Sequence, residues 1–111
     1  MYIIHNDKKI NVVIANTFFK RLKGFMFKKN IDYCIYFPRC NSIHTFFMKE
    51  NIDVVMTDKD NKILKIEKNV AKNKFVSCKK ASNTYEFPSN SVIYNIGDKI
   101  KIEDYELHPL E

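Results

Sequence analysis

Two short apolar runs, at residues 43–48 and 52–57, flank a polar reversal at residues 49–51. Apolar runs of about four to eight residues are typical of strands, and a short polar link between two of them favours a β-hairpin. The stretch IHTFFMKENIDVVMTD therefore predicts a central hairpin around which the rest of the chain is arranged. The same stretch contains the leading candidates for a functional site, which are His44, Lys49 and Asp53.

The length and the apolar content predict one domain with its own core. The chain has 111 residues, of which 45% are hydrophobic, including nine Phe and six Tyr. A chain of this size can bury enough surface to fold without disulfides or metal, and its hydrophobicity excludes intrinsic disorder. We therefore expect residues 1–111 to form a single domain.

The charge is strongly positive but is dispersed along the chain. The formal net charge is +6, and Arg21 and Arg39 are the only arginines. Base and phosphate recognition relies on the planar guanidinium group, whereas scattered lysines create little focused field. Solvated surface lysines are therefore the preferred interpretation, and a nucleic-acid interface stays open as the less favoured alternative.

The sequence offers no signature of a cofactor or a metal centre. Three cysteines match no zinc pattern, and the three histidines, His5, His44 and His108, fall on separate predicted elements. A phosphate-binding glycine loop and a nucleophile elbow are also missing. We expect no cofactor and no metal, free thiols in a reducing compartment, and no signal peptide or membrane span. The predicted location is cytoplasmic.

Before the central stretch, the pattern predicts a hairpin and one helix. Residues 2–5 and 9–15 alternate around an Asn-Asp turn. Thr17 is suited to cap a helix, and Gly24 is suited to end it. The apolar residues between and beyond them recur at helical spacing: Phe18, Phe19, Leu22, Phe25 and Met26. We expect this basic amphipathic helix to pack its apolar face on the sheet of the same chain.

The remaining elements are predicted to be short strands. They are expected at residues 33–37, 63–68, 75–78, 85–87 and 99–103, with a helical turn at 91–96. The fold class is therefore mostly β (α+β): a small compact β-barrel-like or meander sheet domain with one short amphipathic helix packed on it.

A series of short landmarks follows this order along the chain. The series begins with Arg21 and Gly24-Phe25-Met26. It continues with Ile35-Tyr36-Phe37, IHTFFMK with Ile52-Asp53, Glu86-Phe87-Pro88 and Ile96-Gly97-Asp98. In order and approximate spacing the series resembles the prokaryotic domain-of-unknown-function family 192, over about residues 15–102. The resemblance implies a small mostly-β domain with a short helix after the first strands. We expect a bacterial source. It implies no particular activity.

The chain departs from the family pattern at two turns. Asn51 stands where the family usually has a proline, and Asn90 stands where it often has a glycine. Asparagine adopts positive φ more readily than other residues that carry a Cβ, so a left-handed turn at residue 90 is retained.

His44 and Asp53 could form a catalytic dyad only if the hairpin places their side chains close together. A three-residue loop in the predicted hairpin would place the two side chains on opposite faces. A four-residue loop would place them on one face, about two residue pairs apart and beyond hydrogen-bond reach. The dyad is therefore disfavoured. Asp53 is better explained as an acceptor for backbone N–H groups of the preceding loop or as a partner of Arg21, and Glu86 as a partner of Arg21 or a lysine.

These residues support a binding role before a catalytic one. The first hypothesis is a non-catalytic ligand-binding or accessory and interaction module, with a concavity whose tentative binding residues are Arg21, His44, Lys49, Asp53 and Glu86. No catalytic residue is assigned, and we expect the domain not to be an enzyme. The alternative is a small hydrolase or transferase acting on an anionic substrate, with His44 as base and Lys49 or Arg21 as anion clamp.

Overall fold

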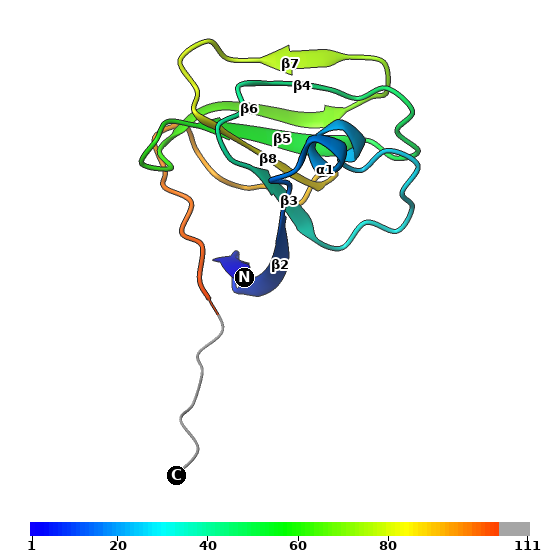
Figure 1. Ribbon diagram of the computed structural model, residues 1–111. Coiled ribbons are helices and arrows are strands. Elements are labelled where there is room, and N and C mark those ends of the chain that lie inside the picture. Colours follow the sequence, from blue (N-terminus) through cyan, green and yellow to red (C-terminus); the bar gives the residue numbers. More distant parts are fainter. Residues whose placement is uncertain (105–111) are drawn as a thin grey trace.

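The computed structural model describes residues 1–104 (Figure 1). His108, considered above as a metal ligand, lies outside the described residues. The elements follow one another as β1 (Tyr2–His5), β2 (Lys8–Ile14), α1 (Phe18–Lys23), β3 (Cys34–Phe37), β4 (Ser42–His44), β5 (Ile52–Thr57), β6 (Ile63–Val70), β7 (Phe75–Ser77) and β8 (Asn83–Pro88).

Six strands form one open sheet in the order β1-β2-β3-β8-β5-β6. The β2–β3 pair is parallel, and the other neighbours in this sheet are antiparallel. The remaining strands, β4 and β7, pair antiparallel as a separate two-stranded sheet, drawn above the larger one in Figure 1. The predicted fold class, mostly β with one short helix, is confirmed.

The predicted central hairpin is wrong. β4 pairs with β7, with Ile43 opposite Val76, whereas β5 lies in the larger sheet between β6 and β8. All six residues of β5 are buried, and the two neighbouring strands occupy both of its edges. The run at 43–48 is held elsewhere, because Thr45 donates its backbone N–H to the carbonyl of Lys74 at 2.9 Å. Its side-chain hydroxyl donates to the carbonyl of Ala71 at 2.7 Å.

The first hairpin and the helix agree with the sequence prediction. Asn6 and Asp7, with φ of 52° and 60°, form the turn between β1 and β2, as expected for residues that tolerate positive φ. The Thr17 hydroxyl accepts a hydrogen bond from the Lys20 N–H and caps α1, which Gly24 ends. The apolar face of α1 is less covered than expected: Phe19 and Leu22 are exposed, and the fully buried ring is that of Phe25, just after the helix.

The C-terminal part of the described chain is less regular than predicted. Residues 91–96 form no helical turn. Residues 99–103 form two isolated bridges in place of a strand, Lys62 with Lys99 and Tyr2 with Glu103. Ile100 between them is buried. The apolar-polar alternation of residues 99–103 therefore reflects one buried side chain in an irregular segment. Among residues 1–104, no helix combines the length and the apolar character needed to cross a bilayer, and the cytoplasmic location stays a prediction.

Both faces of the larger sheet carry a hydrophobic core. One core contains Ile52, Val54 and Met56 of β5 together with Phe25 and Phe37. The other contains Val55, Tyr85 and Phe87. Side chains alternate between the two faces of a strand. Glu86, which lies opposite both Ile35 and Val54, therefore projects into the first core.

Candidate functional site

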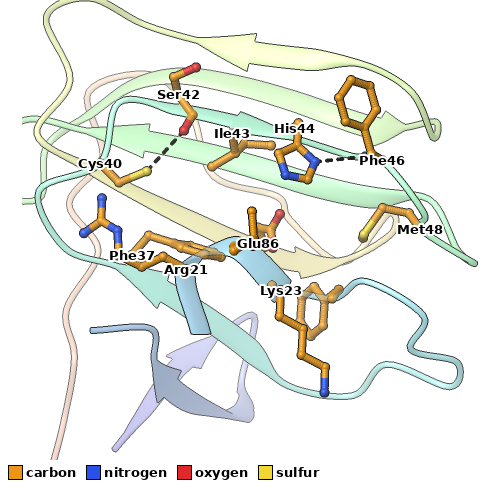
Figure 2. A pocket seen from close by; sticks show the side chains of 13 residues that line it. Arg21, Lys23, Phe37, Cys40, Ser42, Ile43, His44, Phe46, Met48 and Glu86 are labelled. Atoms are coloured by element: carbon orange, nitrogen blue, oxygen red, sulfur yellow. Dashed lines mark hydrogen bonds between the residues drawn. The ribbon is translucent and has the colours of Figure 1, made fainter. Parts of the chain in front are cut away.

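A partly enclosed cavity of about 270 Å³ opens between α1, β3, β4 and β8 (Figure 2). Its walls are mainly apolar and aromatic, formed by Leu22, Phe25, Phe37, Ile43, Phe46 and Met48. Its polar groups are fewer: Arg21, Lys23, Cys40, Ser42, His44 and Glu86. A concave apolar surface with a small number of polar groups is the usual character of a small-molecule site.

Glu86 is the buried polar group of this cavity. The residue is 2% exposed, and its Oε1 atom has no hydrogen-bond partner among residues 1–104. Burial raises the pKa of its carboxyl group to about 8, while a hydrogen bond from the backbone N–H of Phe25 acts in the opposite direction. No salt bridge within residues 1–104 involves this carboxyl, so the predicted pairing of Glu86 with Arg21 or a lysine is wrong. The group is predominantly protonated at neutral pH.

Gly24 allows the end of α1 to approach this carboxyl closely. Its φ of 47° and ψ of −129° lie in a region that residues with a Cβ avoid. A Cβ atom at this position would lie 2.8 Å from Oε1 of Glu86. Glycine is therefore required here both by the backbone conformation and by the space available.

His44 faces the same cavity from β4, and a backbone contact fixes its tautomer. Its Nδ1 atom accepts a hydrogen bond from the Phe46 N–H at 3.1 Å, and the two rings stack with centroids 4.9 Å apart. A neutral imidazole that accepts at Nδ1 carries its proton on Nε2. Figure 2 shows this second nitrogen on the side of the ring that faces Glu86. His44 therefore offers the cavity a hydrogen-bond donor.

Arg21 and Lys23 bring positive charge to the α1 side of the cavity. The Arg21 guanidinium donates to the carbonyl oxygens of Pro38 at 2.6 Å and Arg39 at 3.0 Å. These contacts fix the side chain at the turn after β3 without neutralising it. Within the described part of the chain, neither cation forms a salt bridge, so the predicted pairing of Arg21 with Asp53 is also wrong.

Lys49 and Asp53 do not line this cavity. Asp53 is fully buried in β5, where its Oδ1 accepts the N–H groups of Asn69 and Asn90 and its Oδ2 accepts that of Val92. Asp53 thus accepts backbone N–H groups, but the prediction that they come from the loop before β5 is wrong: Asn69 lies near the end of β6, and Asn90 and Val92 lie after β8. Lys49 is exposed and borders a separate, open depression beside Phe47.

The other ionisable candidates are engaged in structural contacts. His5 accepts the Ile93 N–H at its Nε2 atom and stacks on Tyr94 with centroids 3.9 Å apart. The Cys40 thiol lies 3.3 Å from the backbone carbonyl of Ser42 and donates to it. Among residues 1–104, no cluster of three or more His, Cys, Asp or Glu side chains could hold a metal ion.

The sequence indicated Arg21, His44 and Glu86, and the structure brings these three to one cavity. The sequence did not indicate the aromatic walls, because Phe25, Phe37 and Phe46 come from three segments that are brought together only by the strand order. One signal was present: Glu86 stands between two aromatic residues, Tyr85 and Phe87. A carboxyl in such a position is a candidate buried group.

The chain belongs to the DUF192 family, whose model, described as "Uncharacterized ACR, COG1430", matches residues 1–102. The resemblance noted in the sequence is confirmed.

Two curated relatives are UPF0127 proteins. That of Thermococcus sibiricus is 35% identical over 101 residues, covering 83% of this chain and 66% of its own length. The UPF0127 protein PH1112 of Pyrococcus horikoshii is 33% identical over 112 residues, covering 89% of this chain and 96% of its own length. The chain thus spans just under two thirds of the first relative. Both relatives are archaeal, so they do not confirm the predicted bacterial source.

Comparison with solved structures supports the same fold. The crystal structure of a protein of unknown function from Novosphingobium aromaticivorans matches with a TM-score of 0.75 at 14% identity. The match covers 91% of this chain and 82% of the other. At this identity the similarity concerns the fold alone.

Proposed function

We propose that this domain is a non-catalytic module that binds a small organic ligand in the cavity between α1, β3, β4 and β8. The observation that carries this proposal is the buried Glu86 carboxyl, whose Oε1 atom has no partner among the described residues and lies in a cavity with mainly apolar walls. An unsatisfied buried polar atom costs about 1–3 kcal/mol. A ligand that bonds to this atom recovers part of that cost.

The dimensions of the cavity limit the ligand to a small molecule. Pockets for drug-sized ligands enclose about 300–1,000 Å³, and this one encloses about 270 Å³. From the predicted binding residues, the proposal retains Arg21, His44 and Glu86. Lys49 and Asp53 are left out, because one borders another surface and the other is occupied by backbone N–H groups.

The alternative function, a hydrolase or transferase with His44 as base, has less support. A base at Nε2 would require the proton on Nδ1, and the hydrogen bond from the Phe46 N–H then would be lost. No carboxylate orients the ring among the described hydrogen bonds of His44. Binding is therefore the function that these contacts favour.

The proposal is tested by titrating the protein with benzoate, benzyl alcohol and benzylamine while recording amide NMR shifts. At least one probe is expected to give saturable shifts concentrated at Gly24, Phe25 and Ile43, since these residues line the cavity. Saturable binding by none of the three, or shifts concentrated elsewhere, would contradict it.

A matched pair of variants on α1 locates the binding. Leu22 borders the cavity, whereas Phe19 on the same helix does not. Leu22→Trp is expected to weaken probe binding about tenfold or more by filling the mouth, and Phe19→Trp is expected to leave it unchanged. Both positions are exposed, so neither substitution overpacks the core. Equal effects of the two variants would argue against this cavity.

A further inference from the structure

We propose that the ligand of this cavity is a small organic acid, whose carboxylate binds between Glu86 and His44 and whose apolar part lies against the aromatic walls. The inference rests on the proposed function and adds the chemical class of the ligand. It follows from the hydrogen-bond donors, the charges and the surface of the cavity.

The Glu86 carboxyl and the His44 ring each offer the cavity a hydrogen-bond donor, beside the cations Arg21 and Lys23 and the Ser42 hydroxyl. Because Oε1 of Glu86 has no partner, the hydrogen bond from the Phe25 N–H must fall on the other carboxyl oxygen. The carboxyl proton then belongs on Oε1, where it can be donated to a ligand. The Nε2–H of His44 is the second donor. Two donors facing one cavity match the two acceptor oxygens of a carboxylate.

The charges around Glu86 favour an anion over a cation. The other polar groups that line the cavity are Arg21 and Lys23 from α1, Ser42 and His44 from β4, and the Cys40 thiol after β3. None is a carboxylate. An ammonium ligand would have to approach two cations and also force Glu86 to ionise, whereas a carboxylate is attracted by the cations and binds the protonated acid.

The walls distinguish an organic acid from an inorganic anion. Phe25, Phe37 and Phe46 offer aromatic surface and no polar atoms to satisfy a phosphate or sulfate. Burying a multiply charged ion without bonding all of its oxygens is costly, whereas burying an apolar ring is favourable by roughly 25 cal/mol per Å². A monocarboxylate with one small apolar group fits both parts of the cavity.

The test compares the dissociation constants of benzoate, benzyl alcohol and benzylamine, which share one ring and differ in the polar group. Isothermal titration near pH 7 is expected to give benzoate an affinity about tenfold or more above the other two. At about pH 8, calorimetry in two buffers of different ionisation enthalpy should show uptake of up to half a proton per benzoate bound, because carboxylate binding favours the protonated form of Glu86.

Substitutions at Glu86 assign the donor. Glu86→Gln keeps an N–H donor but does not ionise. Its benzoate affinity should therefore stay within about threefold of wild type, and it should not show the fall in affinity that wild type shows above pH 8. Glu86→Leu has no donor and should lose about tenfold. A residue with a merely structural role would not change the pH profile. Should Glu86→Leu fail to fold, the pH dependence of benzoate affinity in Glu86→Gln still shows whether Glu86 is the donor.

Two results would overturn the inference and leave the proposed function standing. One is tighter binding of benzylamine with release of protons. The other is equal binding of benzyl alcohol and benzoate at the cavity. If none of the probes binds there, the inference and the proposed function fail together.

Discussion

At the scale of single residues, Glu86 makes the stability of the fold depend on pH. The pKa of its carboxyl group is about 8 in the folded protein, against an ordinary value of 4.5. Between these pH values the folded chain holds a proton that the unfolded chain has released. The stabilisation from this group is therefore complete below about pH 4.5 and declines as the pH rises toward 8, by about 1.4 kcal/mol per pH unit.

Glu86→Gln should remove this decline, because the amide does not titrate. The measurement is the free energy of unfolding from urea denaturation at about pH 5.5, 6.5 and 7.5. The difference between wild type and variant should shift by about 1.4 kcal/mol for each unit in favour of the variant. The lowered pKa of His5, caused by burial, contributes equally to both proteins and cancels. Parallel pH dependences would show that the carboxyl is ionised in the folded state.

Asp53 should be the more important carboxylate for stability. It binds three backbone N–H groups, one near the end of β6 and two in the segment after β8. Asp53→Asn replaces one acceptor oxygen with a donor and leaves at least one buried N–H unpaired, at a cost of about 2–4 kcal/mol in unfolding free energy. Asp60→Asn, at an exposed position, is the control and should cost less than about 0.5 kcal/mol. Equal midpoints in urea would refute the structural role of Asp53.

Sequence reasoning identified the important residues better than their roles. His44 and Glu86 were named, but Glu86 was expected to pair with Arg21 or a lysine, since a carboxylate is rarely buried without a partner. That expectation fails when a second layer covers the sheet, as α1 and β4 do here. The partners of Asp53 lie sixteen to thirty-nine positions further along the chain. Residue types and local spacing do not specify contacts of that range.

At the scale of elements, local sequence signals were sufficient to predict an element where residues close to it in sequence stabilise it. The Asn6-Asp7 turn and the Thr17 and Gly24 caps act within a few residues, and they were predicted correctly. The hairpin at 43–57 failed because two apolar runs separated by a polar link do not determine which edges they pair with. β5 pairs with β6 and β8, and β4 pairs with β7.

Gly24→Ala should test how closely the end of α1 approaches the cavity. The substitution forces a Cβ into a conformation with φ of 47° and into a position 2.8 Å from Oε1 of Glu86. We expect a loss of about 2–4 kcal/mol in unfolding free energy and weaker ligand binding. Gly97→Ala is the matched control, since Gly97 also has positive φ, at 95°, but no atom of the described neighbouring residues lies within 4 Å of its Cβ position. Gly97→Ala should cost only the backbone strain, about 1–2 kcal/mol. Losses of equal size would mean that the approach to Glu86 imposes no constraint.

At the scale of the whole molecule, the charge distribution argues against nucleic acid as the main partner. The cations that are focused on one site, Arg21 and Lys23, border a cavity of about 270 Å³, which is too small for a polymer backbone. Retention on single-stranded DNA should therefore be weak even at low salt. Tight retention that falls steeply with salt would contradict this expectation and revive the alternative.

The topology should also set the rate of folding. The sheet is completed by strands that lie far apart in the chain: Ile35 pairs with Glu86, Val55 with Tyr85, and in the smaller sheet Ile43 with Val76. Each pairing requires closing a long loop before the contact stabilises the fold, so folding of such β-rich domains takes roughly milliseconds to seconds.

Stopped-flow refolding monitored by tyrosine fluorescence is suitable, because the chain contains six Tyr and no Trp. Val55→Ala, in the buried strand β5, should slow refolding, whereas Val13→Ala, at an exposed position of β2, should leave the refolding rate nearly unchanged. Refolding within microseconds, or equal effects of the two variants, would mean that folding is governed by local contacts and not by the long-range pairing that also assembles the cavity.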